Sequence, residues 1–185
     1  VRTTLGLPRD PKRIEAFDIS TIGGVDAVGS MVLFVNGKPR NSGYRRFRIR
    51  TVEGSDDFAM MAEVVHRRMH RLKETRDRTP DLLLIDGGKG QLSAAKRGME
   101  RAGVTNVPIV SLAKKREELY VEGEKEPIRL SRRSPVLKLL QRARNEAHRF
   151  AVDYHRRLRR KRIETSELDS VPGVGDCLLY TSDAA

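Results

Sequence analysis

The 185-residue chain contains no tryptophan and a single cysteine, Cys177. One cysteine excludes an intrachain disulfide framework, and we expect a reducing compartment, the cytoplasm. The sequence also lacks any run of about 18 apolar residues, so no membrane span is expected. Its first residues show no charged segment followed by an apolar one, so we expect no export signal. With 38% hydrophobic residues, the chain can still bury the core of one domain.

Acidic residues are few relative to basic ones, and the formal net charge is +12. Twelve basic and only two acidic residues lie between Arg132 and Arg162. A cationic segment of this kind is typical of a helix that binds phosphate groups of a nucleic acid. A solvated helix face is the alternative. A membrane-surface helix is disfavoured, because tryptophan is absent and the apolar stripe of the segment is needed for the core.

The hydrophobic pattern predicts alternating strands and helices. Asn36-Gly37 is typical of a type I′ hairpin turn, and Ser134-Pro135 is a helix start. The predicted elements are strands 13–19, 29–35 and 44–50, a helix from about 55 that ends before Pro80, a buried strand 82–85, a helix 91–101, a strand 108–112, an exposed hairpin 120–130, and a helix from 135 to at least 158. This order predicts an α/β fold with a mixed sheet flanked by helices, as in the ribonuclease H-like fold, with the first and fourth strands side by side.

Three side chains lie where such a fold would gather them. Asp18 is on the first strand, Asp86 ends the fourth, and His148 lies beside the apolar stripe of the last helix. Neighbouring strands are about 4.8 Å apart, so two carboxylates can share a cation. Carboxylates favour Mg²⁺ or Mn²⁺, and such an ion can activate water against a phosphate. The alternatives are a turn residue for Asp86 and a core-edge imidazole for His148.

Six blocks of sequence extend this pattern along the chain: Phe17–Ser20, Gly29–Phe34, Tyr44–Phe47, Asp56–Met60, Leu84–Leu92 and Glu146–Ala151. In order and spacing they resemble UvrC, the nuclease subunit of bacterial nucleotide excision repair, over residues 8–175. The similarity corresponds to the C-terminal half of that family. It implies a metal-dependent endonuclease domain that hydrolyses a phosphodiester bond on the 5′ side of a DNA lesion.

The resemblance also implies a set of site residues. Its catalytic positions fall on Asp18, Asp86 and His148, which would hold Mg²⁺ or Mn²⁺, and a further aspartate falls on Asp57. Asp56 is the better candidate for the helix N-cap. Asn145 stands where the family usually has aspartate, and we expect it to tune the site. Basic residues and hairpin glycines are the DNA-binding candidates: Lys89, Arg149, Arg156, Arg157, Gly173 and Gly175.

The implied partners are damaged double-stranded DNA and UvrB, although the usual UvrB-binding segment and the GIY-YIG nuclease for the 3′ cut are not in this sequence. We expect a linker at 1–12 and the nuclease domain at 13–163. Residues 164–176 resemble the start of a helix-hairpin-helix motif. Residues 177–185 resemble a translated sequencing adapter, which predicts a non-native tail and a truncated motif.

Other patterns were weighed against simpler explanations. His66 and His70 have helical spacing suitable for zinc, but the intervening arginines favour a solvated face. The loop after Asp86 lacks the pattern of a nucleotide-triphosphate-binding loop. Basic residues at 44–46 and 114–116 either contact phosphate or line an exposed surface. The functional alternative to a nuclease is a catalytically silent DNA-binding module that recruits other repair proteins.

Overall fold

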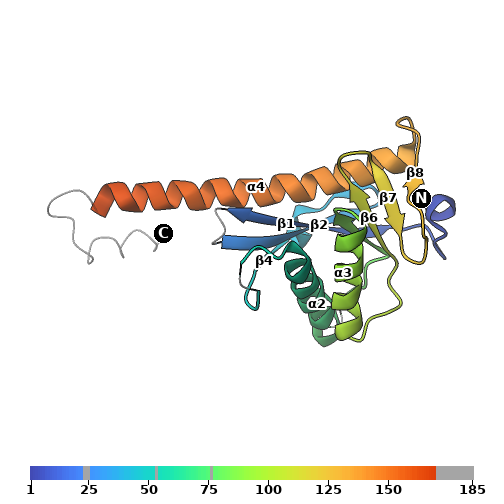
Figure 1. The fold of residues 1–185 in the computed structure, drawn as a ribbon, viewed down its shortest axis with the longest axis horizontal. Helices are drawn as coiled ribbons and strands as arrows, with labels where there is room; N and C mark the ends of the chain where they lie inside the picture. The colour runs from blue at the N-terminus through green and yellow to red at the C-terminus, as the bar shows by residue number, and fades with distance from the viewer. Residues whose placement is uncertain (23–25, 53, 76, 170–185) are drawn as a thin grey trace. The chain divides into compact units, whose positions relative to one another are not determined.

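The computed structural model describes residues 1–22, 26–52, 54–75 and 77–169. The strands are β1 (Arg13–Ile22), β2 (Asp26–Val35), β3 (Lys38–Pro39), β4 (Arg45–Arg48), β5 (Leu82–Asp86), β6 (Ile109–Ala113), β7 (Glu118–Val121) and β8 (Ile128–Arg129). Within the described residues they form one sheet in the order β3-β2-β1-β5-β6-β7-β8, with β4 paired to β2 (Figure 1). The predicted mixed α/β architecture is confirmed.

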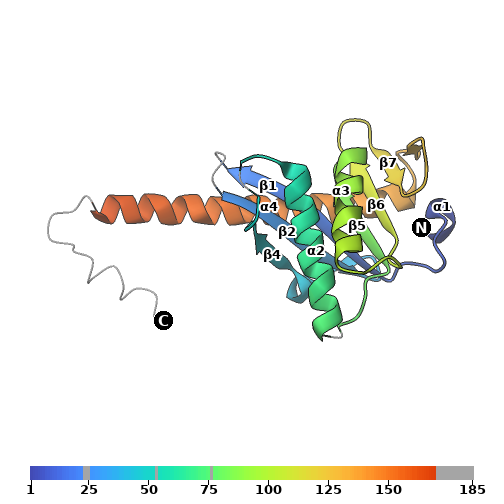
Figure 2. The same cartoon turned by 60° about the horizontal axis from the view of Figure 1, so that its bottom comes forward.

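Four helices accompany the sheet in the described part of the chain: α1 (Arg2–Leu5), α2 (Asp57–Thr75), α3 (Lys89–Arg101) and α4 (Pro135–Asp169). The chain divides into two units, Val1–Ala151 and Val152–Ala185, so α4 begins in the first unit and ends in the second. Within the first unit, α2 and α3 lie against one face of the sheet and α4 against the other (Figures 1 and 2). None of the helices in the described ranges has the length and apolar character of a membrane span.

The register of β1 explains how the sheet is assembled. β1 pairs antiparallel with β2, with Asp18 opposite Ser30, and parallel with β5, with Ala16 opposite Leu84. The first and fourth predicted strands are therefore neighbours, as expected. The turn after β2 has φ of 50° at Asn36 and 76° at Gly37, which are the positive values that a type I′ hairpin requires.

Alternation along the strands divides the core into two clusters. Phe17 and Ile85 face α2 and α3, whereas Ala16 and Leu84 face α4. The run 82–85 is fully buried on both faces, which explains why its sequence is apolar without alternation. On the α4 side, the small residues Ala143 and Ala147 allow the helix to pack closely on the sheet.

One segment differs from the prediction. Residues 1–12, expected as a linker, contain α1, and the side chains of Leu5 and Leu7 are buried in the core. The difference arises from tertiary contacts, because short apolar stretches among charged residues give a weak local signal. The hairpin expected at 120–130 corresponds to β7–β8, and residues 122–126 in its turn are exposed. β7 begins before the predicted range and extends the sheet by pairing with β6.

Candidate metal centre

Asp18 is buried at the point where β1 passes under α4. Ile14 and Ala16 belong to the α4-side cluster, and the two-residue period of a strand places Asp18 on the same face. Its side chain is only 8% exposed. A carboxylate so placed loses most of its hydration, which requires a compensating partner.

Asp86 reaches the same face as the last residue of β5. Leu82 and Leu84 lie in the α4-side cluster, so Asp86 follows them by the same period. The chain then turns sharply at Gly87, whose φ is 144°. A Cβ at this position would lie 2.5 Å from the Gln91 side chain, so a larger residue does not fit there. Gly87 therefore lets α3 start immediately after the aspartate.

His148 comes from α4, which a buried hydroxyl ties to the sheet. The Ser30 hydroxyl on β2 donates to the carbonyl oxygen of Ala147 over 3.1 Å. His148 is the next residue, and its Nδ1 lies 3.1 Å from Oδ2 of Asp18. The imidazole is 48% exposed, so the cluster has two buried carboxylates and an imidazole that solvent can reach.

Asp18, Asp86 and His148 each offer one ligand atom within 4.8 Å of the others, and they form the one such group of three found among the described residues. The structure thus brings together the three residues that sequence reasoning selected. A buried oxygen of Asp86, Oδ2, accepts no hydrogen bond from any described residue. Two carboxylates and an imidazole with an unused acceptor fit a hard or borderline divalent cation.

Lys114 contributes a cation to this cluster. It follows β6, and its Nζ lies 3.1 Å from Oδ2 of Asp86 and 3.3 Å from Nδ1 of His148. The contact with Asp86 is an ion pair whose angles fall outside those of a hydrogen bond. Nδ1 of His148 cannot accept from Lys114 and donate to Asp18 at once in one neutral tautomer. The ammonium group therefore competes for the same polar atoms that a metal ion would use.

The electrostatics of the cluster favour a bound cation. Burial, and next the nearby charge of Asp86, raise the pKa of Asp18 from 3.8 to about 6, although His148 and Lys114 act in the opposite direction. The existing positive groups thus leave the charge of Asp18 incompletely compensated. A divalent ion would supply the missing charge.

Asp56 and Asp57, at the start of α2, have different roles. Asp56 Oδ1 accepts hydrogen bonds from the backbone N–H groups of Phe58 and Ala59, both over 3.0 Å, so Asp56 is the N-cap. Asp57 is exposed in the first turn, and it is not part of the three-residue cluster. A catalytic role for Asp57 stays a prediction.

The DNA-binding candidates lie on several elements. Lys89 is exposed at the start of α3, and Arg149 on α4 forms hydrogen bonds with Glu146 over 2.6 and 2.8 Å. Arg156 and Arg157 are exposed on the part of α4 that belongs to the second unit. Gly173 and Gly175, like the predicted helix-hairpin-helix and tail, lie outside the described residues.

Several contacts around the site were not anticipated. Arg144, which is buried, forms a bidentate pair with Glu117 over 2.8 and 3.2 Å, tying α4 to the turn that carries Lys114. Arg144 also donates to Asn145, whose side chain is thereby occupied. In the sequence, Lys114 is one of three consecutive basic residues and carries no signal of its own. Its position directly after β6, the strand that pairs with β5, is the signal that identifies Lys114 as a neighbour of Asp86.

Two alternatives from the sequence have structural explanations. The rings of His66 and His70 lie with centroids 6.0 Å apart and planes tilted by 40°, and Nδ1 of His70 lies 3.5 Å from Glu74. Neither histidine belongs to a group of three metal-ligating side chains among the described residues. Tyr44 donates a hydrogen bond to Glu146 over 2.9 Å, and burial, followed by this contact, raises the pKa of its phenol. Arg46 lies 4.0 Å from the ring centre of Phe150.

Comparison with solved structures finds weak similarity to endonuclease V proteins. The Bacillus subtilis endonuclease V matches 84% of this chain and 90% of its own, with 12% identity and a TM-score of 0.45. A Ciona intestinalis endonuclease V, solved with DNA containing an inosine, matches 59% of this chain and 48% of its own, with 19% identity and a TM-score of 0.44.

Sequence comparison gives a much closer relationship. UvrABC system protein C of Dehalococcoides mccartyi is 53% identical over 95% of this chain, and that of Solibacter usitatus is 54% identical over 95%. The chain spans about 30% of the length of the first protein and 28% of the second. The family profile of the UvrC RNase H endonuclease domain matches residues 2–152. The chain therefore belongs to the family of UvrC RNase H endonuclease domains.

Proposed function

We propose that this chain is a metal-dependent DNA endonuclease domain that makes the 5′ incision beside a lesion in nucleotide excision repair. The observation that carries the proposal is the grouping of Asp18, Asp86 and His148 within 4.8 Å of one another. Family membership supports the nuclease class. The relatives are named as protein C of the UvrABC system, which supports UvrB as a partner. We include damaged duplex DNA as the substrate and the cytoplasm as the location in the same proposal.

The residues of the cluster would divide the work of hydrolysis. Asp18 and Asp86 would hold Mg²⁺ or Mn²⁺ through their carboxylate oxygens. When bound, the ion supplies Lewis acidity toward a phosphate oxygen and neutralises developing negative charge. The burial of both carboxylates strengthens their hold on a cation, because little water screens the attraction.

His148 would complete the site from the solvent side. Its Nδ1 faces Asp18, and this contact orients the imidazole over the carboxylates. Because the ring is half exposed, its other nitrogen, Nε2, can exchange a proton with solvent and act in general acid–base catalysis. Lys114, which is also half exposed, can turn from Asp86 toward a phosphate of the DNA when a metal ion binds.

The test is nicking of a duplex that carries one bulky lesion, in Mn²⁺ or Mg²⁺, by this chain and by its Asp18→Ala variant. We expect metal-dependent nicking on the 5′ side of the lesion, and its loss in the variant. Binding of the duplex without nicking under either metal would contradict the proposal and favour a catalytically silent DNA-binding module. Nicking that persists in the variant would place the chemistry elsewhere.

A further inference from the structure

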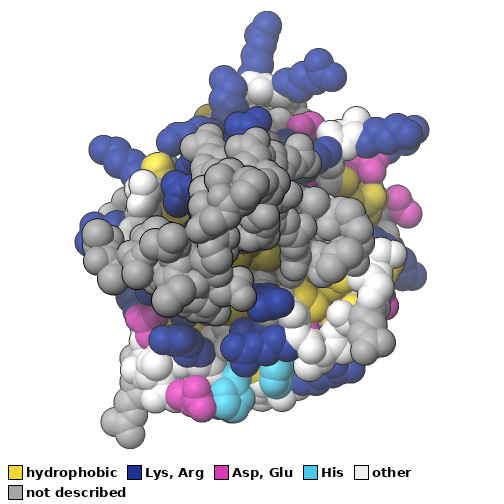
Figure 3. Space-filling model, turned by 90° about the vertical axis from the view of Figure 1, so that its left-hand side faces the viewer, with side chains coloured by type: hydrophobic (Ala, Val, Ile, Leu, Met, Phe, Trp, Pro, Cys, Tyr) yellow, Lys and Arg dark blue, Asp and Glu magenta, His cyan; other side chains and the backbone are white. Residues whose placement is uncertain are grey.

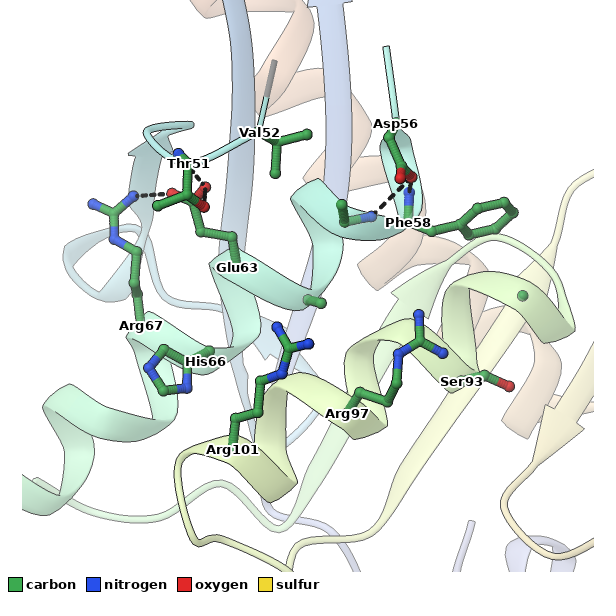
Figure 4. A pocket seen from close by; sticks show the side chains of 13 residues that line it. Thr51, Val52, Asp56, Phe58, Glu63, His66, Arg67, Ser93, Arg97 and Arg101 are labelled. Atoms are coloured by element: carbon green, nitrogen blue, oxygen red, sulfur yellow. Dashed lines mark hydrogen bonds and ion pairs between the residues drawn. The ribbon is translucent and has the colours of Figure 1, made fainter. Parts of the chain in front are cut away.

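A groove of about 750 Å³ runs between α2 and α3, on the side of the sheet opposite α4 (Figure 4). The two helices touch closely at Gly98, where a Cβ would lie 2.4 Å from the carbonyl oxygen of Ala62. One end of the groove lies at Phe58, in the first turn of α2, and at Gly90, which is in the first turn of α3 and four residues after Asp86. The groove therefore begins beside the loop that leads out of the proposed metal centre.

The groove carries uncompensated positive charge. Arg97 and Arg101 extend from α3 with i,i+4 spacing, and neither has a hydrogen bond or ion pair with any described residue (Figure 4). The acidic residues of the groove are already engaged. Glu63 accepts hydrogen bonds from Thr51 and Arg67, whereas Asp56 caps α2. Two guanidinium groups are thus available to an anionic ligand.

Two further features of the groove suit a ligand with polar and flat apolar parts. Nδ1 of His66 is buried and has no hydrogen-bond partner in the described part of the chain. Phe58 is 50% exposed and is the one large hydrophobic side chain exposed to this extent among the described residues. On one face of the molecule, lysine and arginine side chains adjoin histidines (Figure 3).

We propose that this groove binds a single-stranded stretch of DNA next to the metal centre. Arg97 and Arg101 contact successive phosphates, and the ring of Phe58 stacks on a base. Positive grooves with exposed aromatic rings bind single strands in this way, with little sequence preference. DNA is favoured over an acidic peptide because the groove begins at the loop that follows Asp86, where the proposed function places a phosphodiester. The proposal rests on that function for its ligand, and it does not depend on catalysis.

The test is the affinity for a fluorescent oligothymidylate, measured by anisotropy in EDTA so that no cleavage occurs. The Arg97→Ala/Arg101→Ala variant is expected to bind about tenfold more weakly or worse. Its slope of log affinity against log salt should fall by about 1.4, because each single-strand phosphate contact contributes about 0.7. The matched control is Lys138→Ala/Arg142→Ala, which removes the same charge at the same spacing from α4 and should change both quantities less.

The Phe58→Ala variant provides an independent measurement. Loss of stacking should weaken binding by about fivefold or more, with the salt slope unchanged, since a neutral ring releases no counterions. Unchanged affinity in the double arginine variant, or equal losses in that variant and its α4 control, would overturn the groove proposal. So would binding of a polyglutamate peptide with the same arginine dependence when oligothymidylate shows none. Nicking by the wild type is scored separately, so either proposal can fail without the other.

Discussion

At the scale of single residues, the candidate site is defined by two buried carboxylates close to one another. Asp18 and Asp86 lie on neighbouring strands and face the same helix, and burial, followed by the charge of Asp86, raises the pKa of Asp18. Lys114 and His148 offset part of this rise. Replacing any one of these groups changes the net charge of the cluster, and the change can be measured as a difference in stability, in cleavage or in metal affinity.

The Asp86→Ala variant should lose cleavage and retain DNA binding. We expect nicking to fall by more than about 100-fold, because even outer-shell partners of a metal site contribute 10- to 100-fold. DNA affinity without metal should be unchanged or tighter, since the substitution removes negative charge that would face phosphates. Asp10→Ala, which removes an exposed carboxylate distant from Asp86 in the sequence, is the control. Parallel loss of folding and cleavage would indicate a structural role for Asp86.

The Asp18→Asn variant should be more stable than the wild type at neutral pH when no metal is present. The pKa of Asp18 is raised to about 6, so the folded state binds this proton more tightly than the unfolded state. The resulting stability is present below about pH 4 and is lost as the pH rises through 6. We expect the variant's advantage in urea denaturation to grow by about 2 kcal/mol between pH 4 and 8. A constant difference across this range would contradict the raised pKa.

The Lys114→Met variant should bind Mn²⁺ more tightly than the wild type. The ammonium group competes with the ion for Asp86, and a half-exposed ion pair contributes up to about 1 kcal/mol, which corresponds to a two- to fivefold gain. Isothermal titration calorimetry measures this affinity directly. The neighbouring exposed Lys115→Met is the matched control, and equal gains in both variants would indicate a general effect of charge.

At the scale of elements, a few polar contacts hold α4 in the orientation that presents His148. Ser30 on β2 donates a hydrogen bond to the backbone of α4, and Arg144 on α4 pairs with Glu117 in the turn after β6. Tyr44, the residue before β4, donates a hydrogen bond to Glu146 on α4. These contacts lie among apolar residues, which specify burial but leave the rotation of the helix less defined. The polar contacts have directional requirements, and they fix that rotation.

The Ser30→Ala variant tests this element-scale role. Removing the buried hydroxyl breaks its hydrogen bond to Ala147, which should lower the free energy of unfolding by about 1 kcal/mol. Nicking should also fall, because α4 would present His148 less accurately. Thr75→Ala removes an exposed hydroxyl that bonds within α2, outside the groove, and it should leave both quantities nearly unchanged. Wild-type stability in Ser30→Ala, measured by urea denaturation, would show that apolar packing alone positions the helix.

At the scale of the whole molecule, the dominant property is a net charge of +12. Basic residues are concentrated in α4 and also line the α2–α3 groove, whereas the carboxylates of the candidate metal centre are a small acidic region among them. A polyanion is thus attracted to the molecule at long range, while the acidic cluster attracts a cation.

Duplex DNA binding should therefore weaken steeply with salt. If the protein makes about four phosphate contacts, the association constant should fall about 100-fold between 50 and 200 mM salt. The fall arises because releasing counterions from the DNA is less favourable at higher salt. Anisotropy titrations in EDTA with a lesion-bearing duplex give the slope. Affinity that stays flat over this range would argue against both the nuclease and the silent DNA-binding module.

The sequence by itself determined the secondary structure that frames the site and the residues that form it. The alternation in β1, the uninterrupted apolar run of β5 and the start of α4 at Ser134-Pro135 are local signals. They place Asp18 and Asp86 on adjacent strands once the order of strands is recognised. The segment around α1 has a weak apolar signal and differs from the expected linker, because the burial of Leu5 and Leu7 depends on distant partners.

The tertiary structure alone decided how these residues meet. Asp18 and His148 are 130 positions apart in the sequence. Lys114 follows β6, and its Nζ contacts both Asp86 at the end of β5 and His148 on α4. The pairing of Arg144 with Glu117 and the groove lined by Arg97 and Arg101 likewise depend on how the helices lie against the sheet. Sequence periodicity specifies which face of an element is buried, but charge compensation and hydrogen-bond geometry are settled only when separate elements come within a few ångströms of one another.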